Sequence, residues 1–421
     1  MRAQRPPEGG RLTRREGPEG DRRGAGLSGL AWLHLGLLWL AGADLRVIML
    51  AVPPVIPTIH RDLGLDEKGI GALSSLPVLL LAVAAVPGSL LVARLGARRA
   101  LITGLVVVAL SSAGRGLGPS IPVLFAMTVL MGIGVAISQP ASPSVVKDWF
   151  PARVALATAV YANGVLVGEI LPTSLAPWAL AAARGSWELS LVLWSLPVLL
   201  TAVAIALLTP QHAPAADTPD PPWWPDWRSW PTWQAGLLLG CISIMYWGAN
   251  AFIPELLHST GRPSLSTPAL ALLNGAQLPT SIVITLAPSR FIGHRWPFVV
   301  SGLTMAVGVP AMVLAAGAWL LVWTAILGVV SGLVFVCALA LPPLLAAPEN
   351  VARLSAAMFT ITYTCSFIGP VLGGAAWDAT GIPATAFVPA WLSGLAMLAL
   401  AARLQLRRRT SSADPAAARS S

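Results

Sequence analysis

Charged side chains inside otherwise apolar stretches are the residues of this sequence best suited to chemistry. Asp44 and Arg46 lie in an apolar run over about residues 30–58, and Glu169 lies in another over about 152–178. A charge in hydrocarbon is costly unless it faces a cavity or a partner, and a guanidinium can bind a planar oxyanion through two hydrogen bonds. We therefore predict that Arg46 binds an anionic or strongly polar substrate. The alternative is a permanent ion pair with Asp44 or Glu169.

The two carboxyl groups are candidates for proton coupling. Asp44 and Arg46 are two residues apart, about 200° around a helix, so they cannot both face one point. We expect one to face a central cavity and the other a neighbouring helix. A carboxyl that is buried without a partner favours its neutral form, which lets it bind and release a proton. Asp44 and Glu169 are both candidates for this role. For Asp44 the alternatives are an ion pair with Arg46 and a hydrogen bond between helices.

Neutral polar side chains near the centres of the apolar runs form a second group of candidates. Amides and hydroxyls at such positions bind helices together as often as they bind ligands. Trp247 is expected to pack against lipid rather than to line a cavity. The side chains that we predict to contact substrate, besides Arg46, are Gln139, Tyr161, Tyr246, Asn250, Asn274, Gln277 and Tyr363.

The elements that carry these residues must be membrane-spanning helices. Of the 421 residues, 55% are apolar and only 11% are charged, whereas soluble domains carry about 25% charged residues. A helical span needs about 20 apolar residues, and only helices satisfy the backbone of such segments in lipid. Twelve runs are long enough, at about 30–58, 70–93, 98–117, 119–140, 152–178, 188–209, 233–258, 266–290, 296–317, 319–346, 352–377 and 384–405. We therefore expect an all-α membrane protein.

The distribution of basic residues predicts the orientation of these helices. If the N-terminus is cytoplasmic, most of the 27 lysine and arginine residues fall in cytoplasmic segments, as the positive-inside rule requires. The net charge of +9 then reflects topology, and nucleic-acid binding is not expected. The outside loops would hold only Arg61, Lys68, Arg115, Arg184 and Arg262.

The chain divides into two halves. Residues 30–209 and 233–405 each hold six predicted helices, and a proline- and tryptophan-rich cytoplasmic linker at 210–232 joins them. A weak repeat supports the division, since the residues around Arg153 resemble those around Arg353. Segment 1–29 is expected to be disordered and 406–421 to form a cytoplasmic tail. The Arg22-Arg23 pair before the first apolar run resembles a twin-arginine signal, but the run is expected to stay as the first span.

The loop between the second and third spans resembles a motif of the major facilitator superfamily. Ser89-Leu-Leu-Val-Ala-Arg94-Leu-Gly96-Ala-Arg98-Arg99 is similar to the family pattern G-x-L-a-D-r-x-G-r-r. The matching residues, Arg94, Gly96, Arg98 and Arg99, are implied by this resemblance to form a loop that gates conformational change. In the family the Asp latches the two halves in the outward-open state. Ala93 stands in its place here, so the resemblance does not extend to that latch.

A narrower resemblance covers nearly the whole membrane region and points to the cyanate and nitroimidazole permease (CynX/NimT) family. Asp44, Glu169 and Gln139 are departures from it, since the family usually has Asn where Gln139 stands. The two additional carboxylates, Asp44 and Glu169, suggest a different substrate or coupling ion. The residues that carry the resemblance are Asp44-Leu45-Arg46, Arg115 with Gly118-Pro119-Ser120, Lys147-Asp-Trp-Phe150-Pro151, Tyr161 with Gly168, Gln277, Gly369-Pro370 and Trp377-Asp378-Ala379-Thr380-Gly381.

These resemblances imply a major facilitator fold and secondary transport by alternating access. The expected substrate is a small polar anion or a heteroaromatic compound, moved with protons by a monomer in the plasma (inner) membrane with both termini cytoplasmic. The alternatives are a proton-driven exporter of hydrophobic drugs and a membrane receptor that does not transport. No phosphate-binding loop, metal-ligand spacing or catalytic pair is visible, so we expect no enzyme activity, no cofactor and no metal. The expected partners are the substrate and membrane lipid.

Overall fold

The computed structural model describes residues 29–64, 67–118, 120–210 and 223–404, and these segments contain helices but no strand. Within these segments, twelve helical stretches are long and apolar enough to cross a membrane, which confirms the expected number of spans. The predicted N-terminal segment up to residue 28, the tail at 406–421 and most of the linker at 210–232 lie outside the described residues. The chain is therefore an all-α membrane protein.

Several spans consist of more than one helix. Proline interrupts the first span at Pro53-Pro54, and the eighth and tenth spans are broken at Ala276 and Ala340. The first half of the chain forms α1 (Gly29–Leu50), η1 (Pro53–Val55), α2 (Ile56–Leu63), α3 (Glu67–Leu95), α4 (Ala97–Gly114), α5 (Ile121–Trp149), α6 (Val154–Ala182) and α7 (Trp187–Leu208). The second half forms α8 (Trp230–Ser259), η2 (Pro263–Leu265), α9 (Ser266–Gly275), α10 (Gln277–Leu286), α11 (Pro288–Phe291), α12 (Trp296–Leu314), α13 (Trp319–Leu339), α14 (Leu341–Leu345), η3 (Pro348–Asn350), α15 (Val351–Thr380), η4 (Pro383–Phe387) and α16 (Val388–Ala402).

The fourth span is longer than its sequence predicts. We expected it to end near Pro140, but α5 continues through Pro140 and Pro143 to Trp149. Proline is tolerated within membrane helices where other groups satisfy the backbone. The hydroxyls of Ser142 and Ser144 donate to carbonyl oxygens one turn back, at 2.9 and 3.3 Å. They reach the carbonyls of Ser138 and Pro140, whereas the prolines free those of Ala136 and Gln139, so the continuation of α5 rests on its packing against α3, α4 and α15.

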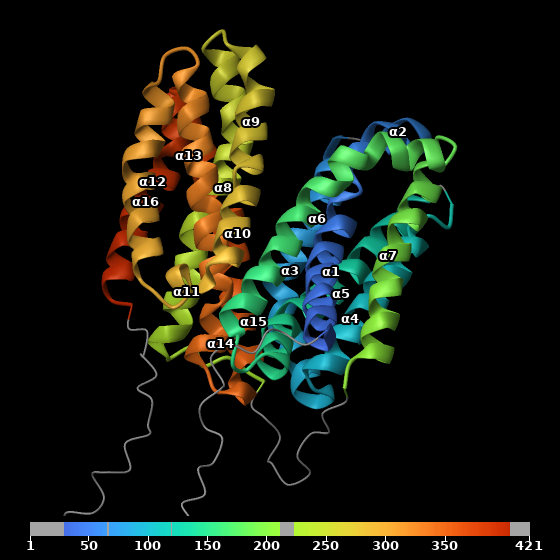
Figure 1. Ribbon diagram of the computed structural model, residues 1–421. Coiled ribbons are helices and arrows are strands. Elements are labelled where there is room, and N and C mark those ends of the chain that lie inside the picture. Colours follow the sequence, from blue (N-terminus) through green and yellow to red (C-terminus); the bar gives the residue numbers. More distant parts are fainter. Residues whose placement is uncertain (1–28, 65–66, 119, 211–222, 405–421) are drawn as a thin grey trace, which may run out of the picture.

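The two halves repeat the same pattern of helix packing. In the first half α1 packs on α6, α3 on α5, and α4 on α7; in the second half α8 packs on α15, α9 on α13, and α12 on α16. Each half is a separate bundle in Figure 1. The contacts between the bundles also come in a related pair, because α3 packs on α15 and α6 packs on α10.

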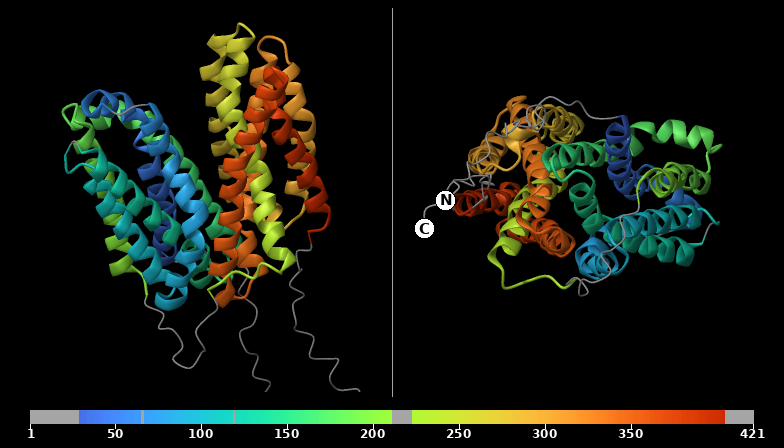
Figure 2. Two further views of the ribbon diagram at one scale, coloured as in Figure 1. Left: turned by 180° about the vertical axis from the view of Figure 1, so that it is seen from behind. Right: turned by 60° about the horizontal axis from the view of Figure 1, so that its bottom comes forward.

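The bundles meet at one end and diverge at the other. The end where they meet carries α11 and α14, and the end where they diverge carries α2 (Figures 1 and 2). We call these the closed end and the open end. At the closed end the Lys147 ammonium at the end of α5 donates to the carbonyl of Ala346, just beyond α14. The structure therefore shows one state, closed at one end and open at the other.

Close contact between α1 and α6 places the charged residues of the two helices side by side. A Cβ atom on Gly42 would lie only 2.5 Å from the Tyr161 carbonyl oxygen, and one on Gly168 would overlap the carbonyl of Ala43. Only glycine allows the two backbones to approach this closely. Arg46 lies one turn beyond Gly42 on α1, and Glu169 directly follows Gly168 on α6.

We expect Gly42→Val to lower the stability of the protein by roughly 1–3 kcal/mol, since overpacking forces the helices apart. The measurement is thermal unfolding of the purified protein in detergent, together with its transport activity. Gly36→Val is the matched control, because Gly36 lies on the same helix with no atom near its missing side chain. Equal melting temperatures for the two variants would contradict the role given to this contact.

Candidate functional site

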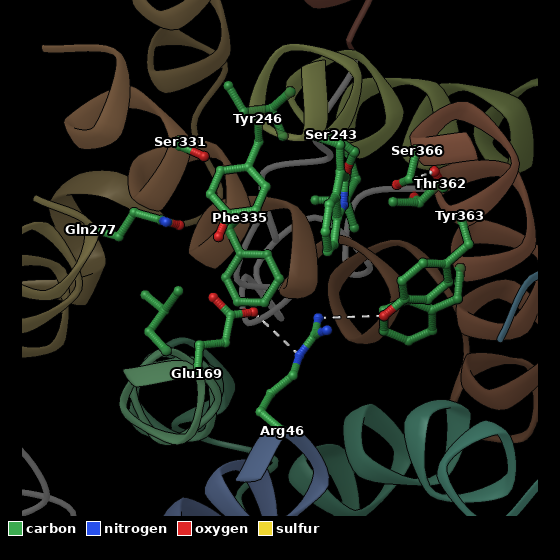
Figure 3. Close-up of a pocket in the computed structure, with 15 residues that line it drawn as sticks. Arg46, Glu169, Ser243, Tyr246, Gln277, Ser331, Phe335, Thr362, Tyr363 and Ser366 are labelled. Atoms are coloured by element: carbon green, nitrogen blue, oxygen red, sulfur yellow. Dashed lines mark hydrogen bonds and ion pairs between the residues drawn. The ribbon is translucent and has the colours of Figure 1, made fainter. Parts of the chain in front are cut away.

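Arg46 is held between the two halves of the protein. Its Nε lies 3.4 Å from Oε1 of Glu169 on α6, and its Nη2 donates to the Tyr363 hydroxyl on α15 at 3.4 Å (Figure 3). Both contacts are long for charge-assisted bonds, which usually measure about 2.7–2.9 Å. The Arg46 and Glu169 side chains are only 12% and 20% exposed. The guanidinium is thus buried, paired with one carboxylate, and only weakly hydrogen-bonded.

Two hydrogen-bonded pairs between the halves, Gln139–Tyr363 and Asn163–Ser281, lie beside Arg46. We call these two pairs the floor of the site. Gln139 on α5 donates through Nε2 to the Tyr363 hydroxyl at 2.9 Å. Asn163 on α6 donates to the hydroxyl of Ser281 on α10 at 2.7 Å, and it accepts a bond from the Trp39 indole at 2.8 Å. Each of these two pairs joins one half to the other. The floor must therefore open if a solute is to pass toward the closed end.

A small pocket of about 50 Å³ surrounds the guanidinium. Side chains of the second half supply most of its wall, and Figure 3 shows them facing Arg46 across the space. The pocket is lined by Arg46, Leu166, Glu169, Leu239, Ile242, Ser243, Tyr246, Trp247, Gln277, Ser331, Phe335, Phe359, Thr362, Tyr363 and Ser366.

A large cavity of about 700 Å³ adjoins this pocket and extends toward the open end. Arg46, Leu166, Glu169, Tyr246 and Trp247 border both spaces. The remainder of the large cavity is mostly apolar, and it is lined by Met49, Leu50, Val52, Pro53, Leu73, Pro77, Val78, Arg115, Thr128, Ile170, Ser174, Asn250, Thr267, Leu270, Ala271, Asn274 and Gly275.

Three of the predicted polar residues form a hydrogen-bonded group on the wall of the large cavity. The Tyr246 hydroxyl donates to Oδ1 of Asn274 at 2.5 Å, and Nδ2 of Asn274 donates to Oδ1 of Asn250 at 3.0 Å. The group joins α8 to α9. Because these side chains largely satisfy one another, they shape the wall and have few free donors for a solute.

The other predicted residues occupy different positions. Tyr363 and Gln277 line the small pocket, and Gln139 lies behind Tyr363 as its hydrogen-bond partner. Tyr161 is 3% exposed, lies against Gly42 of α1 and lines neither space. In this state Tyr161 supports the α1–α6 contact rather than touching the pocket.

Asp44 faces away from the site. It is 3% exposed, and its side chain approaches Thr201 of α7 inside the first bundle. One carboxyl oxygen, Oδ2, has no hydrogen-bond partner. Arg46 therefore faces the cavity and Asp44 faces a neighbouring helix, and the carboxylate that pairs with Arg46 is Glu169.

Several wall residues were not found from the sequence. Trp247, which we expected to face lipid, lines both spaces, since the α8 face that carries Tyr246 turns toward the first bundle. Phe335 and Ser331 belong to α13, a uniformly apolar span in which no signal marks one face. The sequence assigns Arg115 to an outside loop, whereas in the structure it caps α4, is 1% exposed and lines the large cavity.

The predicted gating loop turns sharply and is tied to the first bundle. Gly96 has φ of 80°, which suits glycine at the turn between α3 and α4. Arg98 donates to the Thr209 hydroxyl and to the carbonyl of Ala206 at the end of α7, both at 2.7 Å. Arg94 and Arg99 are exposed. In this state Arg98 therefore caps a helix of its own half.

Ser89, which occupies the first motif position, connects this region to the linker. Its hydroxyl lies 2.7 Å from the carbonyl oxygen of Trp223 and 2.7 Å from that of Val86, within donating distance of both. Glycine at this position could not make either contact. The substitution thus adds a contact between α3 and the segment that joins the two halves.

Two six-helix bundles around a buried polar site are the architecture of many secondary transporters. The sequence profile of the Major Facilitator Superfamily matches residues 35–285, and the chain belongs to this family of transporters. The expected membership is thereby confirmed, and the family and relatives are transporters rather than enzymes.

The chain is similar in sequence to two curated transporters and similar in fold to a solved transporter structure. The 2-nitroimidazole transporter of Escherichia coli (strain K12) is 28% identical over 357 residues, covering 83% of this chain and 89% of the relative. The cyanate transport protein CynX of the same strain is 27% identical over 168 residues, covering 40% of this chain and 44% of CynX. The crystal structure of FucP in the outward conformation has a TM-score of 0.72 at 16% identity and covers 89% of this chain and 100% of FucP.

Proposed function

We propose that this transporter moves a small polar anion or a heteroaromatic compound, coupled to protons, with Arg46 as the substrate-binding cation. The observation that carries the proposal is the position of the guanidinium, on the wall shared by the small pocket and the large cavity. The names of the relatives, one for cyanate and one for 2-nitroimidazole, support the same class of substrate.

The hydrogen bonding of Arg46 leaves capacity for a ligand. A guanidinium has five N–H donors in a rigid fork. Here one bond of 3.4 Å reaches Tyr363, and Nε has a carboxylate at 3.4 Å but no well-formed hydrogen bond. A planar or linear anion can therefore gain short charge-assisted bonds that the protein itself does not make.

Binding of an anion at Arg46 provides a route to proton coupling through Glu169. A monoanion beside Arg46 would place two negative charges next to one cation, which disfavours the ionised form of the carboxyl. Glu169 would then take up a proton as the anion binds and release it when the anion leaves. Asp44, buried with one unpartnered oxygen, is the alternative proton carrier, but it does not contact the site.

Tyr363 can convey the presence of substrate to the floor, because its hydroxyl bonds both Arg46 and Gln139. An anion that draws the guanidinium toward itself lengthens the Arg46–Tyr363 contact and frees the tyrosine. The floor pairs Gln139–Tyr363 and Asn163–Ser281 then separate as the bundles rock. Alternating access would follow from this motion around a fixed site.

The charges at the closed end support one orientation in the membrane. The α3–α4 turn and α11 lie at this end (Figure 1), and they carry Arg94, Arg99 and Arg290. Basic residues favour the cytoplasmic side. We therefore propose a monomer in the plasma (inner) membrane with both termini in the cytoplasm. The open end, which carries α2, then faces the exterior, so the structure is outward-open.

A ligand-stabilisation screen on the purified protein tests the substrate class. We expect thiocyanate, cyanate or 2-nitroimidazole to raise the melting temperature by several degrees, and Arg46→Ala to remove the increase. The apolar wall of the large cavity favours a second candidate, a proton-driven exporter of hydrophobic compounds. Stabilisation by lipophilic drugs that survives Arg46→Ala would contradict anion transport and support that candidate. Ligands that bind without crossing liposome membranes would indicate a receptor.

A further inference from the structure

A second arginine lines the large cavity near the open end. Arg115 follows the last residue of α4, and only 1% of its surface is exposed. Its side chain nevertheless borders the large cavity, as does that of Arg46. Two buried arginines therefore line one space, at different depths along the path from the open end to the floor.

The guanidinium of Arg115 is only partly satisfied. Its Nη2 donates to the carbonyl of Ile48 at 3.2 Å and to the hydroxyl of Ser112 at 3.1 Å. Nε and Nη1 are buried and have no hydrogen-bond partner. Within the described parts of the chain Arg115 makes no ion pair, in contrast to Arg46. A buried cation without a counter-charge is unfavourable unless an anion compensates it.

A structural role accounts for only part of this arrangement. Ile48 belongs to the last turn of α1, where carbonyl groups lack partners within the helix, and a cation is favourable at such an end. That role uses Nη2 alone. It requires neither the two free nitrogens nor a position on the cavity wall, and a neutral amide could also fulfil it.

We propose that Arg115 forms a second, outer binding site for a small monoanion. The anion would accept hydrogen bonds from Nε or Nη1, after a small shift of the apolar side chains that cover them. Thr128 and Leu73 line the same cavity from α5 and α3. From this site the anion would pass to Arg46, so the outer site raises the local concentration of the anion beside the transport site. The transfer step, though not the binding, rests on the proposed function.

Selenocyanate, a linear monoanion that scatters anomalously, tests binding directly in crystals of the wild-type transporter. We expect one selenium peak within hydrogen-bonding distance of Arg115 and another beside Arg46. Absence of the Arg115 peak while Arg46 is occupied would overturn the inference. A peak at Arg115 without one at Arg46 would support the outer site and contradict the proposed function, so the two failures are distinguishable.

The kinetics of cyanate uptake into proteoliposomes distinguish two contributions of Arg115 to transport. One is its positive charge, and the other is its hydrogen bond to the Ile48 carbonyl at the end of α1. Arg115→Gln keeps a donor for the Ile48 carbonyl but loses the charge, and we expect about a tenfold higher KM at low ionic strength with nearly unchanged kcat. Arg115→Lys keeps the charge and should stay within about threefold of wild type. Arg262→Gln is the matched control, because Arg262 also donates to a backbone carbonyl, that of Ala315, yet does not line the cavity. Equal KM values for Arg115→Gln and Arg262→Gln would overturn the transfer role.

Discussion

Replacement of Arg46 by alanine should abolish transport of cyanate. A bound anion would lose two charge-assisted hydrogen bonds, each worth about 1.5–3 kcal/mol, so kcat/KM should fall by roughly 10²- to 10⁴-fold. Arg46→Lys should recover only part of this loss, because an ammonium cannot reproduce the planar fork. The measurement is uptake of labelled cyanate and 2-nitroimidazole into proteoliposomes that contain equal amounts of each variant.

The controls for this experiment address folding and general charge effects. Arg46→Ala leaves Glu169 without its partner, so Arg46→Ala combined with Glu169→Gln tests whether an unpaired carboxylate causes the defect. Arg290→Ala removes an exposed arginine at the closed end and should leave uptake unchanged. If Arg46→Ala and Arg46→Lys both express normally and transport at wild-type rates, the guanidinium does not bind substrate.

The second large effect is expected from Glu169→Gln. If one proton accompanies each monoanion, a gradient of one pH unit can drive about tenfold accumulation, since one unit corresponds to about 1.36 kcal/mol. Glutamine cannot release a proton, so the variant should accumulate no substrate in response to the gradient. It should still exchange labelled for unlabelled substrate across the membrane, because Arg46 remains in place.

Asp44→Asn is the matched comparison, since it neutralises the other buried carboxyl while leaving the pocket intact. We expect it to keep pH-driven accumulation. Loss of coupling in Asp44→Asn with normal coupling in Glu169→Gln would transfer the role to Asp44. Unchanged coupling in both variants would exclude proton coupling through either carboxyl.

The fold could be predicted from the sequence because its signal is summed over long segments. Each span rests on about 20 apolar residues, so individual prolines and uncertain ends do not change the number of spans. The ends themselves were less predictable. The predicted last residue of the fourth span, Pro140, lies nine residues before the last residue of α5, Trp149. The packing that stabilises a helix beyond Pro140 involves distant parts of the chain, which the local sequence does not reveal.

The site could be predicted only where a charge contrasts with its surroundings. Arg46 and Glu169 stand out inside apolar runs, and they are paired in the structure. Arg115 lies at the end of a span, where an arginine in a loop would give the same pattern. Phe335 lines the pocket from an apolar helix, and nothing in its local sequence distinguishes it from residues that face lipid.

The floor of the pocket has an energetic consequence for the direction of transport. Gln139–Tyr363 and Asn163–Ser281 are bonds between neutral groups, and such bonds between membrane helices contribute only about 0.6 kcal/mol each on average. This is close to the thermal energy, so the floor pairs add little bias between the outward- and inward-facing forms. Uptake and efflux would be the same cycle run forwards or backwards, and breaking these pairs would slow neither direction strongly. The chemical potentials on the two sides of the membrane would then decide which one the cell observes.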